Sequence, residues 1–301
     1  MATQRYVMLE GRGIVMITGE DRVTFLQGLI SNDVTHVSGT RSVYAAFLTP
    51  QGKYLHDFFL AEIGESLVLD CERERAGDLV RRLRVYKLRS KVAVEDVSAD
   101  WAVAALIGED AARSVGLGGG EPGAAVPFAG GVAFVDPRLA EVGVRAILPR
   151  AEAAQRLEAA GFTADAPAAY DALRIGLGLA DGSRDMEPER TVLLECGFDE
   201  LHGVDWEKGC FLGQELTART RYRSLVRKRL VPVELDGPPP PSGTPVLRDG
   251  REVGEMRSGA EGLGLAMLRL EALGEGGSAP LTAGEARLTP RLPSWLKLPA
   301  D

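Results

Sequence analysis

Residues 43–60 read VYAAFLTPQGKYLHDFFL, in which two runs rich in aromatic and aliphatic residues flank the tetrapeptide TPQG. Pro50 presets its own φ, and Gly52 is free to take a positive φ. The stretch therefore predicts a β-hairpin with strands at 43–48 and 53–60. Asp57 then lies within the second strand of an antiparallel sheet in the N-terminal half of the chain.

Short strands and amphipathic helices surround this hairpin without strict β–α–β alternation. Strands are predicted at 14–17, 66–70, 91–97, 101–107, 131–135 and 144–149, and helices at 21–30, 72–86, 151–161 and 169–179. The glycine-rich stretch 116–123 is a predicted loop, because no strand precedes it and no helix with Lys-Ser/Thr follows it, as a phosphate cradle requires. The mixture indicates an α+β fold.

The pattern changes after about residue 225. Short strands at 226–235, 244–250, 251–257 and 262–270 are separated by glycines and by DGPPPPSG. This composition predicts a small antiparallel β-barrel. We therefore divide the chain into an α+β region, 1–225, and a barrel domain, 226–301.

Composition limits the classes of partner. Lys and Arg total 35 against 43 Asp and Glu, and the net charge of −8 argues against broad wrapping of a nucleic acid. No window is apolar enough to span a bilayer, and the N-terminus lacks the apolar core of a secretory signal, so no membrane partner is expected. The 3 cysteines form no disulfide framework, and we expect a cytoplasmic protein.

The densest chemical signal is WEKGCFLGQELTARTRYR at 206–223. A thiol at Cys210, beside Lys208 and ahead of a helix that begins near Gly213, is partly stabilised as the reactive thiolate. The alternative is a small buried hydrophobic residue, the usual state of a free cysteine. Gln214 and Glu215 either bind a ligand or cap the helix.

Two basic runs stand out in this acidic chain: Arg81, Arg82, Arg84, Lys87, Arg89 and Lys91, and then Arg219, Arg221, Arg223, Arg227, Lys228 and Arg229. Either run suits contact with a polyanion. A solvated helix face and a charged edge strand are the alternatives. The histidines have no metal-ligand spacing, so a metal site built from protein side chains alone is not expected.

Five segments in this order resemble the YgfZ group of folate-binding proteins, relatives of the glycine-cleavage T-protein that take part in iron–sulfur protein maturation. They are ITGEDRVTFLQGLISNDV (17–34), FLTPQGKYLHDFFL (47–60), RIGLGLADGSRD (174–185), KGCFLGQE (208–215) and REVGEMRS (251–258). The octapeptide at 208–215 resembles the signature K-G-C-[FY]-x-G-Q-E. The resemblance implies a T-protein-like ring of interleaved ferredoxin-like α+β subdomains, which binds folate in region 1–225, with a C-terminal barrel.

The resemblance also implies a tetrahydrofolate site with Cys210 near its mouth. A carboxylate reads the amide–amine edge of a pterin, and an aromatic ring stacks on its face, which points to Glu195 and Tyr170. Leu193 replaces the usual proline of the family. A surface carboxylate and a core aromatic are the alternatives. Arg174 matches a T-protein arginine that could hold a carboxylate, unless it only pairs with Asp171 or Asp185.

One departure concerns the hairpin, where T-proteins carry two adjacent acidic residues and this chain has His56-Asp57. A neutral imidazole cannot replace a carboxylate that must stay anionic. The resemblance therefore implies a tetrahydrofolate-binding accessory factor, not a conventional turnover enzyme. It would use Cys210, with Lys208 beside it, to assist iron–sulfur cluster assembly or repair in client enzymes, including tRNA-modifying radical enzymes.

Two other interpretations stay open. A folate-dependent aminomethyltransferase or demethylase would use Asp57 as its base. A weak contact with tRNA would use the arginines between 219 and 229, and salt would weaken it steeply. Because 3 cysteines cannot complete a four-thiolate cage, any cluster would be shared with other ligands.

Overall fold

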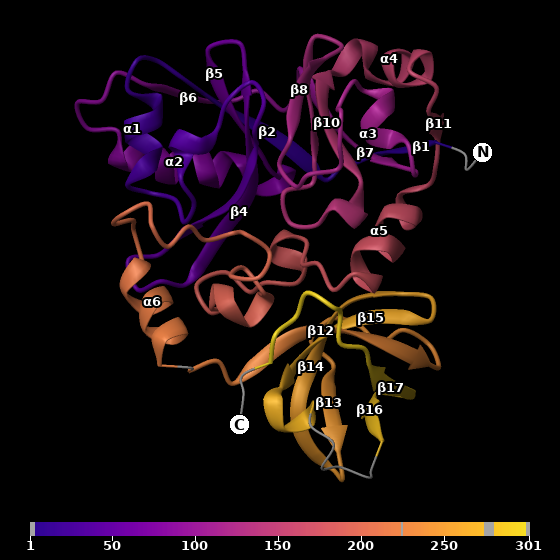
Figure 1. The fold of residues 1–301 in the computed structure, drawn as a ribbon. Helices are drawn as coiled ribbons and strands as arrows, with labels where there is room; N and C mark the ends of the chain where they lie inside the picture. The colour runs from indigo at the N-terminus through magenta and orange to yellow at the C-terminus, as the bar shows by residue number, and fades with distance from the viewer. Residues whose placement is uncertain (1–3, 224, 274–279, 299–301) are drawn as a thin grey trace. The chain divides into compact units, whose positions relative to one another are not determined.

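The computed structural model describes residues 4–223, 225–273 and 280–298 (Figure 1). The chain divides into two compact units. Unit 1 is drawn from Met1–Pro50, Leu55–Pro167 and Leu201–Leu212, and unit 2 from Gln51–Tyr54, Ala168–Glu200 and Gly213–Asp301. Short 3-10 helices lie in the connections at Val34–His36, Arg73–Arg75, Ala140–Val142, Arg150–Glu152, Gly182–Arg184, Leu193–Cys196 and Leu270–Ala272.

The predicted hairpin forms one edge of the first sheet of unit 1. In spatial order, the strands are β3 (Val43–Leu48), β4 (Tyr54–Ile63), β5 (Ser66–Glu72), β2 (Arg12–Thr18) and β6 (Ala93–Asp96). Helices α1 (Arg22–Gln27) and α2 (Ala76–Tyr86) pack on one face through Leu26, Leu79 and Leu83. Helix α1 ends before the predicted residue 30, because Ile30 forms a β-bridge with Phe47 instead.

The second sheet of unit 1 combines predicted and unpredicted strands. Its order is β11 (Thr163–Ala164), β1 (Arg5–Met8), β7 (Trp101–Ile107), β10 (Val144–Pro149), β9 (Gly131–Val135) and β8 (Ala125–Phe128). Helices α3 (Ala111–Ser114) and α4 (Ala153–Ala159) pack against it through Ala111 and Leu157. Strands β1, β8 and β11 are two to four residues long, too short for an alternating pattern to reveal them.

The two sheets of unit 1 meet across a buried layer of rings and charges. The ring of Phe59 on β4 lies 6.2 Å from that of Phe134 on β9. Asp70 on β5 is fully buried and accepts hydrogen bonds from Arg12 Nε at 2.7 Å and from Arg145 Nη1 at 2.8 Å. Arg145 lies on β10 of the second sheet, so Asp70 links the two sheets. The Arg145 guanidinium also stacks over Phe59, 4.0 Å from the ring centroid.

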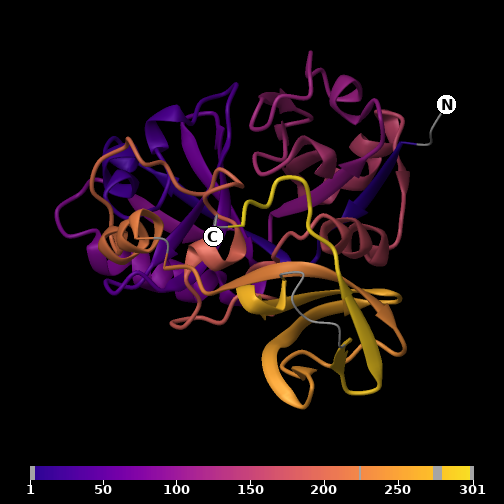
Figure 2. The ribbon, with the colours of Figure 1, turned by 60° about the horizontal axis from the view of Figure 1, so that its bottom comes forward.

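Unit 2 contains the predicted barrel, which is closed (Figure 2). Its strands follow the order β12 (Lys228–Asp236), β15 (Leu263–Arg269), β14 (Arg251–Ala260), β13 (Pro245–Arg248), β16 (Leu281–Ala283) and β17 (Ala286–Pro290). A side chain at Gly254 would place its Cβ 2.3 Å from the carbonyl oxygen of Met267, which explains the glycine in REVGEMR. Helices α5 (Pro167–Gly176) and α6 (Gln214–Tyr222) precede the barrel in sequence.

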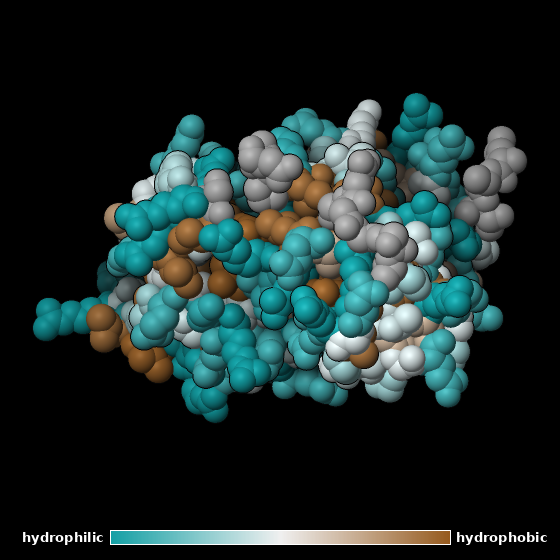
Figure 3. Space-filling model, turned by 90° about the horizontal axis from the view of Figure 1, so that it is seen from below, coloured by the Kyte–Doolittle hydropathy of each residue, from teal (hydrophilic) through white to brown (hydrophobic). Residues whose placement is uncertain are grey.

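Hydrophilic side chains cover most of the face shown in Figure 3, with smaller apolar areas between them. Among the helices that the structure describes, none has the length and apolar character needed to cross a bilayer.

Candidate functional site

The loop that carries Cys210 belongs to unit 1 and is pinned at both ends. Asp205 Oδ1 accepts hydrogen bonds from the backbone N–H groups of Glu207 at 2.7 Å and of Lys208 at 3.0 Å. At the other end, the N–H of Leu212 donates to the carbonyl of Gly28 at 3.0 Å. Phe211 is buried, whereas Cys210 is exposed. The fixed ends therefore present the thiol of Cys210 to solvent.

Lys208 anchors this loop to the segment that follows α1. Its Nζ donates to the carbonyl oxygens of Ile30 at 2.7 Å and of Asn32 at 2.6 Å. Burial lowers the pKa of Lys208 to about 8, although the carboxylates of Asp33 and Asp205 oppose the shift. Because the ammonium donates to the two carbonyls and not to the thiol, the structure gives Lys208 a positioning role. That Lys208 supports a thiolate at Cys210 stays a prediction.

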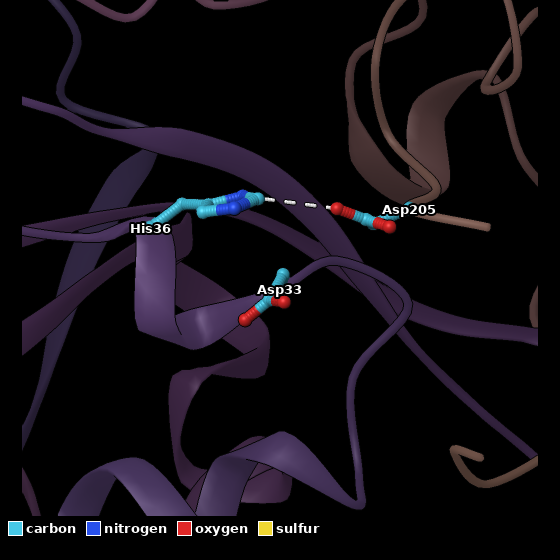
Figure 4. A group of neighbouring side chains, drawn as sticks. All are labelled: Asp33, His36 and Asp205. Atoms are coloured by element: carbon cyan, nitrogen blue, oxygen red, sulfur yellow. Dashed lines mark ion pairs between the residues drawn. The ribbon is translucent and has the colours of Figure 1, made fainter. Parts of the chain in front are cut away.

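The same carboxylates belong to a group of metal-ligand type (Figure 4). One ligand atom from each of Asp33, His36 and Asp205 lies within 4.8 Å of the others, and His36 Nδ1 is 3.7 Å from Asp205 Oδ2. Sequence spacing did not suggest this group, because Asp205 comes from a distant segment. Imidazole and carboxylate suit divalent cations. Asp33 Oδ1 already accepts hydrogen bonds from Gln27 Nε2 at 3.0 Å and from the Thr35 N–H at 2.8 Å.

The three cysteines differ sharply in exposure. Cys71 on β5 and Cys196 in the 3-10 helix Leu193–Cys196 are buried, and burial raises the pKa of both thiols far above the ordinary value. Such thiols stay protonated and inert. Cys210 is thus the one exposed thiol of the chain, and the alternative of a buried hydrophobic residue is wrong for this position.

His56 and Asp57 occupy the positions at which T-proteins carry two acids. Nε2 of the buried His56 lies 2.9 Å from Asp78 Oδ2, and burial lowers its pKa to about 4, with Arg75 acting in the same direction. His56 is therefore neutral at pH 7. Asp57 is buried and accepts a hydrogen bond from the Tyr44 hydroxyl at 3.0 Å.

The lowered pKa of His56 predicts that acid destabilises the fold. Unfolding returns the pKa from about 4 to 6.5, so the unfolded chain binds more protons between these pH values. Stability contributed by neutral His56 is present above pH 6.5 and is lost as the pH falls towards 4. One pKa unit corresponds to about 1.4 kcal/mol, which gives a loss on the order of 3 kcal/mol.

Urea unfolding at pH 7, 6, 5 and 4.5 measures this loss. His56→Gln should unfold with a visibly smaller pH dependence than the wild type over this interval. The same pH dependence in the two proteins would contradict the assignment.

Glu195 in unit 2 lines a pocket of about 480 Å³, here called the Glu195 pocket. Its other lining residues are Arg227, Lys228, Arg269, Leu270 and Glu271. Lys228 Nζ is 3.8 Å from Glu195 Oε2. Burial raises the pKa of Glu195, and Lys228 opposes the shift. Arg269 Nη1 in turn lies 3.8 Å from Glu271 Oε1. The pocket therefore combines three cationic side chains with two carboxylates, of which Glu195 is partly desolvated.

Two predicted ligand residues do not line this pocket. Tyr170 is buried on α5, as the alternative of a core aromatic expects. Arg174 is fully buried, and its guanidinium donates to Asp171 at 2.7 Å, to Asp185 at 2.8 Å and to Ser258 Oγ at 2.9 Å. These contacts agree with the alternative that Arg174 pairs with Asp171 and Asp185. That Arg174 holds a ligand carboxylate stays a prediction.

The remaining predicted site residues begin α6. Gln214 is its first residue, as expected for a helix that begins near Gly213, and the exposed Glu215 pairs with Arg219 at 2.8 Å. Two more arginines of the second basic run are also paired, Arg221 with Asp199 at 3.1 Å and the buried Arg229 with Glu200. Three of the cations proposed for tRNA are thus neutralised by carboxylates.

The fold places the chain in a known class of proteins, and comparisons with known proteins agree. Residues 10–116 match the GCVT N-terminal domain, and residues 227–298 match the CAF17 C-terminal beta-barrel domain. The crystal structure of glycine cleavage system aminomethyltransferase T from Bartonella henselae superposes with a TM-score of 0.77 at 18% identity, covering 98% of this chain and 87% of that one. The chain has the GcvT-like aminomethyltransferase fold with a closed C-terminal barrel, as predicted.

The chain belongs to the IBA57 family of iron–sulfur cluster assembly factors. The mitochondrial IBA57 of Mus musculus is 32% identical to it over 95% of this chain and 84% of that protein. A mitochondrial IBA57 homologue of Mycosarcoma maydis is 35% identical over 80% of this chain, which spans 60% of that protein.

These comparisons correct two expectations. The chain's family is IBA57, related to YgfZ but distinct from it. The predicted cytoplasmic location is contradicted, because the relatives are mitochondrial proteins.

Proposed function

We propose that this protein assists the assembly or repair of iron–sulfur clusters in client enzymes and that Cys210 is the residue that contacts the cluster. Membership of the IBA57 family supports the first part. The observation that carries the second part is the exposure of Cys210 on a loop that Lys208 and Asp205 pin, while the other two thiols are buried. Thiolate is a ligand that iron–sulfur clusters prefer.

One exposed thiol makes the proposed contact transient and shared. Stable cluster binding takes about four thiolates or equivalent ligands. The buried Cys71 and Cys196 cannot reach a cluster at the surface. An assembly partner or client enzyme must therefore supply the other ligands, which suits an accessory factor better than a storage protein or a turnover enzyme.

Complementation in cells tests this proposal. Cells whose own IBA57-family gene is deleted are made to express either the wild-type protein or Cys210→Ala. We expect Cys210→Ala to lower the activity of iron–sulfur enzymes about tenfold or more, because the cluster loses its ligand from this chain. Glu207→Ala, an exposed position in the same loop, is the matched control and should retain wild-type activity.

A thiol titration shows that the variant is folded. Ellman's reagent should modify one thiol in the folded wild type and none in folded Cys210→Ala, with the buried thiols reacting only in denaturant. Wild-type enzyme activities in cells that express Cys210→Ala would refute the proposed role.

Tetrahydrofolate is the cofactor that we propose for the Glu195 pocket, and the residues present fit it. The Glu195 carboxylate matches the N–H donors along a pterin edge. Arg227, Lys228 and Arg269 match the carboxylates of the glutamate tail. When bound, tetrahydrofolate supplies a reduced pterin that carries one-carbon units. Glu195 would orient the ring, and the three cations would hold the tail.

Calorimetry of tetrahydrofolate binding tests this site separately from cluster assembly. Glu195→Gln should weaken binding by about 10- to 100-fold, because a charge-assisted pair of hydrogen bonds is lost. Glu234→Gln, which removes a half-exposed carboxylate of unit 2 that pairs with Arg291 outside the pocket, should bind as the wild type does. Equal affinities for the wild type and Glu195→Gln would contradict the proposed cofactor site.

No observation favours the one-carbon transferase. Its proposed base, Asp57, is buried and already accepts the hydroxyl proton of Tyr44 in a hydrogen bond, and its neighbour His56 is neutral at pH 7. Contact with tRNA-modifying clients remains part of the proposal, whereas direct tRNA binding gains nothing from the paired arginines of α6.

A further inference from the structure

The end of α2 presents apolar side chains to solvent. Val85 is 69% exposed and Leu88 is 88% exposed, the largest exposed fraction among the large hydrophobic side chains that the structure describes. Their neighbour Leu83 is fully buried in the core of unit 1. Residues 85–91, here called the α2 tip, comprise the last two residues of α2 and most of its connection to β6 (Figure 1).

The backbone of the α2 tip holds Leu88 outward. The N–H of Lys87 donates to the carbonyl of Arg84 at 3.2 Å, and the N–H of Ser90 donates to that of Lys87 at 2.8 Å. Between them Leu88 has a φ of 44°, in the left-handed region that leucine seldom adopts. A strained residue persists only where its surroundings impose the conformation, and such residues concentrate at functional positions. The exposure of Leu88 is therefore built into the turn.

All charged residues of the α2 tip itself are basic, although Asp21 accepts a hydrogen bond from the Lys91 N–H at 2.7 Å. Residues 81–91 contain six basic residues and no acidic one, in a chain of net charge −8. Arg81 and Arg82 pair with Asp78, and Lys91 pairs with Glu20. Among the described residues, the side chains of Lys87 and Arg89 have no ion-pair or hydrogen-bond partner. They flank Leu88 directly in sequence.

We propose that the α2 tip docks on the surface of an anionic lipid bilayer. Val85 and Leu88 enter the interfacial layer, and Lys87 and Arg89 reach the headgroup phosphates from either side, as long cationic side chains do at such interfaces. A nucleic acid offers phosphates but no apolar layer for Leu88. An acidic protein would need a pocket shaped for this tip. A bilayer needs no such pocket, because its interfacial layer accepts a protruding side chain. The expectation of no membrane partner was based on the lack of a segment that could span a bilayer. It does not concern contact with the bilayer surface.

Sedimentation of the full chain with phosphatidylcholine vesicles, with or without phosphatidylserine, tests this proposal. We expect binding to the anionic vesicles and at least about tenfold weaker binding to the neutral ones. Val85→Ser/Leu88→Ser should weaken binding to anionic vesicles about tenfold, because apolar burial is lost. Lys87→Glu/Arg89→Glu should reduce it to the level of neutral vesicles. Tyr222→Ser, an exposed apolar position outside the tip, is the matched control.

Circular dichroism confirms that each variant is folded, and soluble glycerophosphoserine tests whether the headgroup alone competes. Competition by the soluble headgroup, or equal binding of the wild type and Val85→Ser/Leu88→Ser, would overturn insertion, because binding would then rest on electrostatic attraction alone. Absence of sedimentation with anionic vesicles at low salt would overturn the proposal entirely. Neither outcome bears on Cys210, so this surface and the proposed function fail separately.

Discussion

Asp70→Ala is expected to lower the free energy of unfolding by about 3–5 kcal/mol, among the largest effects of any single substitution in unit 1. Asp70 is fully buried and forms ion pairs with Arg12 at 2.7 Å and Arg145 at 2.8 Å. Removing the carboxylate leaves two buried guanidinium groups short of their counter-charge. The two sheets of unit 1 also lose one of the contacts that join them.

Urea unfolding followed by circular dichroism measures this effect. Asp70→Asn keeps the shape of the side chain and one acceptor oxygen, so we expect an intermediate loss of unfolding free energy. This variant provides the measurement if Asp70→Ala does not fold. Asp110→Ala is the matched control, because the Asp110–Arg113 pair is exposed and contributes about 0–1 kcal/mol. A cost for Asp70→Ala as small as that of the control would show that the buried cluster does not stabilise unit 1.

Arg174→Met is expected to destabilise unit 2 by a similar amount, about 3–5 kcal/mol. The fully buried guanidinium neutralises Asp185, whose Oδ1 also accepts the N–H of Ser258 on β14 at 2.9 Å. The substitution leaves the Asp185 carboxylate buried without its cation. A ligand-binding arginine would instead lose affinity for folate at unchanged stability.

A double-mutant cycle separates these two roles. Arg174→Met/Asp185→Asn should cost less than the sum of the single variants by about 1 kcal/mol or more, because each single variant strands the partner. Additive losses would mean that the two residues act independently. Arg184→Met, at a half-exposed position that pairs with Asp171 and Asp181, is the control and should cost much less.

The local elements could be predicted because their signals are local. The apolar runs on either side of TPQG predicted β3 and β4, and Gly52 has the positive φ, 73°, that this turn needs. The spacing of Leu79 and Leu83 likewise predicted α2, and the glycine-separated strands after residue 225 predicted the barrel. Short strands such as β11 were missed, since two residues carry no periodicity.

The sequence by itself determined the fold class, an α+β region followed by a barrel. It also determined which reactive and charged groups the chain carries: three cysteines, of which Cys210 lies in a glycine-flanked loop, and a basic run at 81–91. Only the tertiary structure decided which of these groups face solvent. It exposed Cys210 and Leu88 and buried Arg174, Asp57 and Asp70. Burial and ion pairing depend on contacts between segments far apart in the chain, such as Asp70 with Arg145, and no local pattern encodes such a contact.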